Sequence, residues 1–424
     1  MASSPRVLRR SPPTRRRFFR GSGLHLPHRG PGRHIETIRP FCIAIPEKTL
    51  ADLRERIART RWPDEIAGSG WDYGTNLDDL RALLDYWRDG FDWRAQERKL
   101  NAFSHFVADV EGLDLHFLHE RGRGPNPMPL LLLHGWPSTF FEMSKLVPLL
   151  ADPAAHGGDA RDSFDAIVPS LPGCGFSQRP SEPGMHKTRM AELFVKLMSE
   201  TLGYRRFAAR GGDVGAGVVS LVALDFPERV IGLHVSDVYR PYIGPGARYF
   251  TDAERKFFEE ERTWMEKEGA YDHLQATKPQ TLGYGLNDSP AGLAAWIVEK
   301  YRSWSDCGGD VEKRFTRDEI LTQLTIYWAT QTINSANRLY FERDRAPRPL
   351  GPDDRVRVPT AVALFPGDID QPPREWGERV YDVRRWTVLP RGGHFAALEE
   401  PELLAQDIRE FFRPLRDRIA RADA

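Results

Sequence analysis

Residues 211–215 of the chain read Gly211-Gly212-Asp213-Val214-Gly215, and they are the strongest indication of its fold. It follows a short apolar run at 207–209 and precedes the apolar segment 218–225, which is typical of a helix. Small residues two positions before and after Asp213 allow a sharp turn from a strand into a helix, with the Asp213 side chain exposed at its top. Taken alone, the five residues would also fit a glycine-rich turn with Asp213 as a helix cap. The flanking strand and helix favour a nucleophile at Asp213.

Short apolar runs predict further strands, and they alternate with helical segments. The runs are 130–133, 164–169, 230–238, 360–365 and 386–389. This alternation is typical of an α/β fold whose mostly parallel sheet is covered by helices on both faces. Between 240 and 350 the pattern is helical instead. A helical insertion between two strands predicts a lid over the carboxyl ends of the strands, where active sites of open α/β sheets lie.

The N-terminal part of the chain reads differently. Leu50, Leu53 and Ile57 share one helix face, and Asn76 is a good N-cap for a second helix. The first 35 residues carry nine arginines and no acid, which is typical of a disordered basic arm, although a targeting or surface-binding arm stays open. The expected divisions are a basic arm 1–37, a helical N-terminal region 38–125, a first core half 126–239, a helical lid 240–350, a second core half 351–415 and a tail 416–424.

The composition excludes several classes of protein. Lys+Arg and Asp+Glu balance at 60 each, so the net charge gives no sign of a nucleic-acid partner. The three cysteines, Cys42, Cys174 and Cys307, are far apart, which fits neither a disulfide framework nor a zinc site and indicates a reducing compartment. No stretch approaches the ~20 apolar residues of a membrane-spanning helix. We expect a soluble, cytoplasmic protein without metal or cofactor, and the sequence leaves a homodimer open.

An aspartate at the nucleophile turn has chemical consequences. A serine that attacked an sp³ carbon would form an ether, which water does not readily cleave. A carboxylate that attacks the same carbon forms an ester, which an activated water can hydrolyse. Asp213 therefore predicts an alkyl electrophile, either an epoxide or a halide.

The stretch His134-Gly135-Trp136-Pro137 follows the first strong strand. An oxyanion hole can combine the backbone N–H after the nucleophile with one from a loop after an early strand. These donors would be Val214 and Trp136, because Pro137 has no N–H. An ordinary turn at a strand end is the alternative interpretation of this motif.

A base and its partner are expected near the C-terminus. His394, in Arg391-Gly392-Gly393-His394-Phe395, follows the last predicted strand, and its ordinary pKa near ~6.5 suits it to take a proton from water. The carboxylate that orients it should lie at a strand end between nucleophile and base. Asp368 is preferred, and Asp370 is the alternative in the same turn.

With these motifs assembled, the chain resembles the microsomal-type epoxide hydrolases over residues 38–415. Further matching stretches are Trp71-Asp72-Tyr73-Gly74, Tyr86-Trp87-Arg88-Asp89, Leu286-Asn287-Asp288-Ser289-Pro290 and 391–402. The resemblance implies an α/β-hydrolase fold and conversion of a small-molecule epoxide and water to a vicinal diol. It also implies that Tyr271 and Tyr340 of the lid activate the epoxide oxygen, and it suggests a role in detoxification and in catabolism of aromatic hydrocarbons.

One departure from the family pattern concerns Val214, where the family commonly has tryptophan. The backbone N–H is kept, so we expect the chemistry to survive and the wall beside Asp213 to change. A haloalkane dehalogenase is the nearest rival, and the tyrosine pair argues against it. A non-catalytic ligand-binding protein with the same fold is a rival from another class, but such proteins tend to lose a catalytic position and here all are filled.

Overall fold

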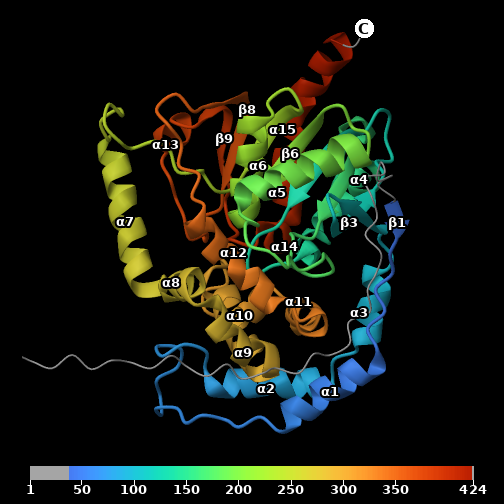
Figure 1. Ribbon diagram of the computed structural model, residues 1–424, viewed down its shortest axis with the longest axis vertical. Coiled ribbons are helices and arrows are strands. Elements are labelled where there is room, and N and C mark those ends of the chain that lie inside the picture. The colour runs from blue at the N-terminus through green and yellow to red at the C-terminus, as the bar shows by residue number, and fades with distance from the viewer. Residues whose placement is uncertain (1–37, 423–424) are drawn as a thin grey trace, which may run out of the picture. The chain divides into compact units, whose positions relative to one another are not determined.

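A computed structural model describes residues 38–422 of the chain, with side chains up to Arg416. The predicted basic arm, 1–37, lies outside the described residues. Nine strands form one sheet in the order β1-β2-β3-β5-β4-β6-β7-β8-β9 (Figure 1). They are β1 (Ile38–Pro40), β2 (His105–Val110), β3 (Leu113–Glu120), β4 (Met128–Leu133), β5 (Phe164–Pro169), β6 (Phe207–Gly211), β7 (Val230–Val235), β8 (Val356–Leu364) and β9 (Tyr381–Val388).

The six strands from β5 to β9 are parallel neighbours, and their central members are almost fully buried. Uninterrupted apolar runs are the expected composition of such strands, because helices cover both faces of a parallel sheet. The core helices are α4 (Leu146–Ala151), α5 (Lys187–Lys196), α6 (Asp213–Asp225), α13 (Arg374–Glu378), α14 (Ala396–Glu399) and α15 (Pro401–Ala422). The mostly parallel α/β sheet predicted from the sequence is confirmed.

Residues 105–120 correct the expectation of a purely helical region from 38 to 125. They form β2 and β3, an antiparallel hairpin that extends the sheet, and β1 pairs with β2. Glu111 and Gly112 both have positive φ, 55° and 82°, as a two-residue type I′ turn requires. The alternating pattern of Leu113, Leu115 and Phe117, all buried, is the physical reason for the strands.

The tail predicted at 416–424 is also corrected, because α15 continues to Ala422. In the sequence, Phe412, Leu415 and Ile419 keep the spacing of one helix face beyond the point where we expected the helix to end. Phe412 and Leu415 are buried, and a Cβ on Gly232 of β7 would touch both side chains. The last helix therefore packs directly on the sheet.

Six helices lie between β7 and β8 and are called here the lid helices: α7 (Asp252–Glu268), α8 (Ala270–Thr277), α9 (Pro279–Asp288), α10 (Pro290–Ser303), α11 (Arg317–Thr330) and α12 (Ile333–Arg345). The last two of them, α11 and α12, are separated by a two-residue break. Gln331 ends α11 in a left-handed conformation, with φ 54°. The chain turns at this residue, and α12 begins two residues later.

The helices of the N-terminal region, α1 (Glu47–Ala58), α2 (Leu77–Asp89) and α3 (Trp93–Leu100), lie along the lid helices rather than on the sheet (Figure 1). The Asn76 side chain caps α2 as expected, by accepting from two backbone N–H groups. Trp87 Nε1 donates to Thr325 Oγ1 of α11 at 3.0 Å in a buried position. Thr75 Oγ1 donates to the backbone oxygen of Ala295 in α10 at 2.8 Å. The N-terminal helices thus hold the outer side of the lid.

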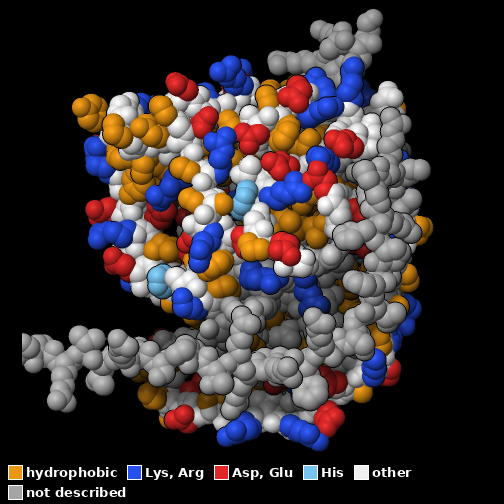
Figure 2. Space-filling view, viewed as in Figure 1, with side chains coloured by type: hydrophobic (Ala, Val, Ile, Leu, Met, Phe, Trp, Pro, Cys, Tyr) orange, Lys and Arg blue, Asp and Glu red, His pale blue; other side chains and the backbone are white. Residues whose placement is uncertain are grey.

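The surface agrees with the balanced composition. On the face shown in Figure 2, basic and acidic side chains are interspersed. None of the helices that the structure describes has the length and apolar character needed to cross a bilayer.

Candidate active site

Asp213 lies at the tight turn between β6 and α6, with φ 50°. Two glycines make this turn sterically possible. A Cβ on Gly211 would lie 2.6 Å from the Ala216 nitrogen, and a Cβ on Gly215 would lie 2.5 Å from the Leu133 oxygen. Both distances are too short for any side chain, so the Gly-x-Asp-x-Gly pattern follows from the backbone geometry of the turn.

The two oxygens of the Asp213 carboxylate have different surroundings. The backbone N–H of Trp136 donates to Oδ1 at 2.7 Å. Oδ2 lies 3.9 Å from Nε2 of His394. One oxygen is therefore held by the loop after β4, while the other faces the imidazole and is free of a close donor among the described residues.

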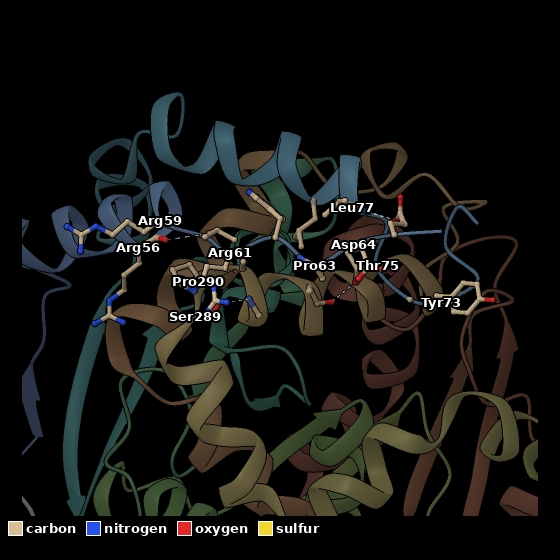
Figure 3. A pocket seen from close by; sticks show the side chains of 18 of the residues that line it. Arg56, Arg59, Arg61, Pro63, Asp64, Tyr73, Thr75, Leu77, Ser289 and Pro290 are labelled. Carbon is tan, nitrogen blue, oxygen red and sulfur yellow. Dashed lines mark hydrogen bonds between the residues drawn. The ribbon is translucent and has the colours of Figure 1, made fainter. Parts of the chain in front are cut away.

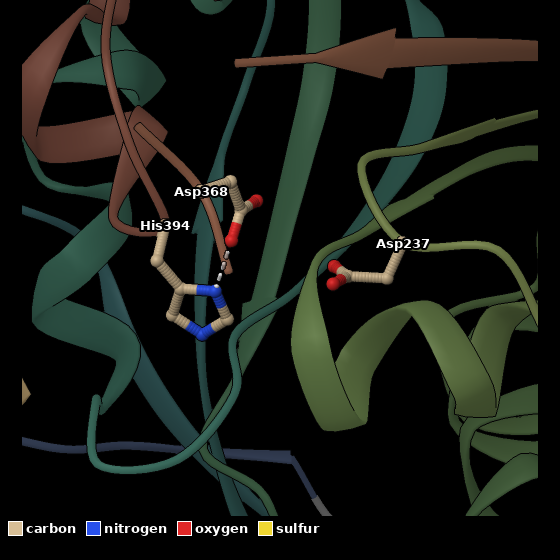
Figure 4. Close-up of side chains that lie close together, drawn as sticks. All are labelled: Asp237, Asp368 and His394. Carbon is tan, nitrogen blue, oxygen red and sulfur yellow. Dashed lines mark hydrogen bonds and ion pairs between the residues drawn. The ribbon is translucent and has the colours of Figure 1, made fainter. Parts of the chain in front are cut away.

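His394 and Asp368 form the expected pair. His394 Nδ1 donates to Asp368 Oδ1 at 2.7 Å (Figure 4), and both side chains are only 4% exposed. This bond fixes the tautomer in which Nε2 is the basic nitrogen. Burial alone lowers the pKa of His394, but the charge of Asp368, its hydrogen bond and the charge of Asp213 raise that pKa well above its ordinary value.

Asp370, the alternative partner, does not bond to His394 in the structure. Burial, together with the nearby charges of Asp237 and Asp368, raises the pKa of its carboxyl to about 7. Asp368 is thus the acid that orients the imidazole, and Asp370 lies in the same turn as a carboxyl that ionises with difficulty.

Asp237 is a member of the site that the sequence reasoning missed. It lies just after β7, and its Oδ2 accepts the backbone N–H of Asp213 at 2.5 Å. Burial first, and then the charge of Asp368, raise the pKa of Asp237 to about 6. Asp237 lies inside the run 230–238 that was predicted to be a strand, whereas the strand ends at Val235. An acidic residue near the carboxyl end of that run, at the edge of the sheet where Asp213 lies, was the available signal.

The spacing of Asp237, Asp368 and His394 also meets the geometric requirement for a cation. One ligand atom of each lies within 4.8 Å of the others, with Asp237 facing the pair from the neighbouring loop (Figure 4). However, Asp368 Oδ1 and Asp237 Oδ2 already accept strong hydrogen bonds from the imidazole and from the nucleophile turn. The cluster is accounted for by these hydrogen bonds.

The two lid tyrosines meet above Trp136, in the loop after β4. Residues 134–137 of this loop are called here the oxyanion loop, for the role expected of them. The ring of Tyr271, on α8, stacks on Trp136 with centroids 5.2 Å apart, and Tyr340, on α12, meets the same indole edge-on at 5.6 Å. The two phenol rings are 5.9 Å apart. Burial raises the pKa of both phenols, and the charge of Asp213 raises them further. Both groups are therefore protonated donors at neutral pH.

Asp213 lines a cavity of about 730 Å³ that we call the nucleophile cavity. Its wall also contains Asp237 and Asp370, with Lys187 of α5 and Gly217 of α6. Val214, which we expected to reshape this wall, is packed in the hydrophobic core and is not part of it. The residue of α6 that shapes the cavity is Gly217, one turn further on.

A second cavity, of about 960 Å³, lies between the N-terminal helices and the lid (Figure 3). Arg56, Pro63 and Tyr73 line one side, and Ser289 and Pro290 line the other. It contains none of the site residues predicted from the sequence. Of these two cavities, the nucleophile cavity is the one that Asp213 lines, whereas His394, Tyr271 and Tyr340 line neither of them.

Comparison with known proteins agrees with this geometry. Residues 38–143 match the family model "Epoxide hydrolase N terminus", and residues 128–266 match "alpha/beta hydrolase fold". Epoxide hydrolase 1 of Oryctolagus cuniculus is 39% identical over 408 residues, which are 90% of each chain.

Solved structures give the same result. The juvenile hormone epoxide hydrolase of the silkworm Bombyx mori superposes with a TM-score of 0.81 at 31% identity, covering 90% of this chain and 95% of that one. An epoxide hydrolase of Aspergillus niger superposes with a TM-score of 0.78 at 28% identity, covering 89% and 97%. The chain has an α/β-hydrolase fold, the N-terminal region of epoxide hydrolases and a relative that is 39% identical over 90% of both chains, and it therefore belongs to the epoxide hydrolase family.

Proposed function

We propose that this epoxide hydrolase works through a covalent ester on Asp213, which water then hydrolyses to release a vicinal diol. The observation that carries the proposal is the unequal environment of the carboxylate. Oδ1 is held by the Trp136 N–H at 2.7 Å, whereas Oδ2 faces His394 at 3.9 Å. An oxygen without a close donor is the better nucleophile, and the gap leaves space for a reacting group.

In the first half-reaction, Asp213 Oδ2 attacks a ring carbon of the epoxide, and the ring C–O bond breaks. The electron pair goes to the epoxide oxygen, which takes a proton from Tyr271 or Tyr340. The raised pKa of both phenols keeps that proton in place until the oxygen becomes a strong base. Their contact with Trp136 aligns the two hydroxyl-bearing rings with the oxyanion loop.

In the second half-reaction, His394 takes a proton from water, and the oxygen attacks Cγ of the ester. Negative charge develops on Oδ1, which already accepts the Trp136 N–H, and Val214 N–H would be the second donor. Collapse of this intermediate breaks the bond between Cγ and Oδ2, so Oδ2 leaves as a hydroxyl oxygen of the diol and takes a proton from the imidazolium. The oxygen of the water stays on Cγ, and its remaining proton returns to the tyrosinate. Attack at Cγ restores the Asp213 carboxylate.

The charges of the site fit this order of events. In the free enzyme, the negative charge of Asp213 is one reason why the pKa of His394 is raised. Ester formation removes that charge, so the pKa of His394 falls when a neutral imidazole is needed as the base. The Asp368 carboxylate, hydrogen-bonded to Nδ1, stabilises the imidazolium that forms next.

A single turnover in ¹⁸O-water tests the covalent route. With enzyme in excess, the first diol should contain ¹⁶O from Asp213, and the label should appear in the enzyme. Asp213→Asn should abolish this turnover, whereas Asp252→Asn, at the exposed first residue of α7, is the matched control. Direct transfer of ¹⁸O from water to the first diol would refute the ester mechanism.

A further inference from the structure

The nucleophile cavity contains a cation without a carboxylate partner. Three arginines line its wall together with Lys187. Each arginine is ion-paired: Arg240 with Glu261 at 2.6 Å, Arg343 with Asp272 at 2.8 Å and Arg348 with Asp225 at 3.0 Å. Among the described residues, no hydrogen bond or ion pair is formed by the Lys187 ammonium. One positive charge of the wall is therefore available to a ligand.

The wall is built to accommodate this lysine. A Cβ on Gly217 would lie 2.7 Å from Lys187 Nζ, 2.9 Å from Cδ and 3.1 Å from Cε. Any other residue at 217 would push the ammonium out of its place. Gly217 on α6 has no side chain, and the side chain of Lys187 on α5 occupies the space beside it. This packing directs Nζ to the start of α6.

The ammonium lies beside the first turns of the helix that begins at the nucleophile. Gly217 is four residues after Asp213 on α6, so the backbone positions of these two residues are about 6 Å apart along the helix axis. Lys187 is partly buried, and its burial lowers its pKa while the charge of Asp213 raises it. A partly desolvated ammonium gains most from an anion that reaches it inside the cavity.

We propose that Lys187 is an anion-binding subsite and that the enzyme acts on epoxides that carry a carboxylate about 6 Å from the ring carbon under attack. The proposal rests on the proposed role of Asp213 as nucleophile. The single unpaired cation matches the single charge of a carboxylate, and the three paired arginines stay with their own partners. The ammonium would anchor the far end of the substrate, which places the epoxide ring beside Asp213.

Two epoxides of equal size test the subsite. In 4-(oxiran-2-yl)benzoate, the phenyl ring separates the epoxide from a carboxylate by about the required length, and 4-(oxiran-2-yl)benzamide is its neutral counterpart. The enzyme should prefer the benzoate in kcat/KM by about 10- to 100-fold, the range of a charge-assisted hydrogen bond. Lys187→Met should reduce the benzoate-to-benzamide ratio by about the same factor.

The matched control is Lys196→Met, the same substitution at the last residue of α5, where the lysine pairs with Glu111. It should leave the ratio as in the unmodified enzyme. Lys187→Gln, which keeps a polar side chain, gives a second neutral variant if the methionine variant does not fold. An equal fall in kcat/KM for both substrates would mean that Lys187 tunes the nucleophile, and this would overturn the subsite.

Binding without chemistry separates this inference from the mechanism. In 4-cyclopropylbenzoate and 4-cyclopropylbenzamide, a ring that cannot be opened replaces the epoxide. Calorimetry should show that the benzoate binds about 10-fold or more tightly than the benzamide and that Lys187→Met removes the difference. Equal affinity in the unmodified enzyme would overturn the subsite, even if the epoxides are turned over. Failure to hydrolyse either epoxide, together with tight benzoate binding, would count against the proposed function alone.

Discussion

Gly135→Ala is expected to displace the nucleophile by steric contact, without replacing any catalytic group. A Cβ at position 135 would lie 2.7 Å from Asp213 Cγ and closer still to its Oδ1. Two carbon atoms normally approach to about 3.5–4.0 Å, so the carboxylate or the loop must shift by about 1 Å. The hydrogen bond from Trp136 to Oδ1, 2.7 Å long, would then stretch to about 3.7 Å and cease to be one.

The loss of one oxyanion donor and a shift of about 1 Å each cost about 10²-fold in rate. We therefore expect kcat/KM to fall by about 10²- to 10³-fold, or about 3–4 kcal/mol of activation free energy. Steady-state diol formation measures the loss, and single turnover shows which half-reaction slows. Gly285→Ala is the control, because its Cβ would meet nothing within 4 Å. A folded Gly135→Ala enzyme with unchanged kcat/KM would refute the assignment of Trp136 N–H.

Three further outcomes are expected. Asp368→Asn should lower the pKa of His394, because the charge of Asp368 raises that pKa. The acidic limb of the pH profile for ester hydrolysis then moves to lower pH. The plateau rate, measured by stopped flow, should drop by about 10³- to 10⁴-fold. Asp237→Ala should cost about 1–3 kcal/mol more than Asp237→Asn in urea unfolding, because only alanine leaves the buried N–H of the nucleophile without an acceptor. Trp87→Phe should lower the free energy of unfolding by about 1–2 kcal/mol in the same assay, because it removes the hydrogen bond to Thr325. Equal stability of the variant and the unmodified enzyme would contradict this.

Much of the sheet could be predicted because its signals are local. The apolar run 164–169 coincides with β5, and the predicted strand at 130–133 lies within β4. A parallel strand buried on both faces is apolar throughout, so composition alone identifies it. Asp213 was recognisable for a similar reason, since its turn needs glycines at fixed positions.

The parts that were missed depend on information that is not local. The hairpin of β2 and β3 alternates buried and half-exposed residues, and a short alternation carries a weaker signal than the strong helix pattern that precedes it. Asp237 is separated from Asp213 by 24 residues, and only the pairing of β6 with β7 brings them together. Chain order led us to prefer Asp368 over Asp370 as the partner of His394. Only the structure shows which of the two carboxylates the turn directs at the imidazole.

The outer position of the N-terminal helices has a consequence for the order in which the chain is made. Trp87 binds Thr325, which lies 238 residues later in the sequence. At about 5–20 residues per second, a ribosome needs roughly 10–50 s to add that length. Throughout this interval the apolar faces of α1 and α2 lack the lid helices that they contact in the folded protein. Tyr340, on α12, is added soon after Thr325, whereas Asp368 and His394 are added later still. The cover for the N-terminal helices is therefore synthesised before the catalytic centre can be complete.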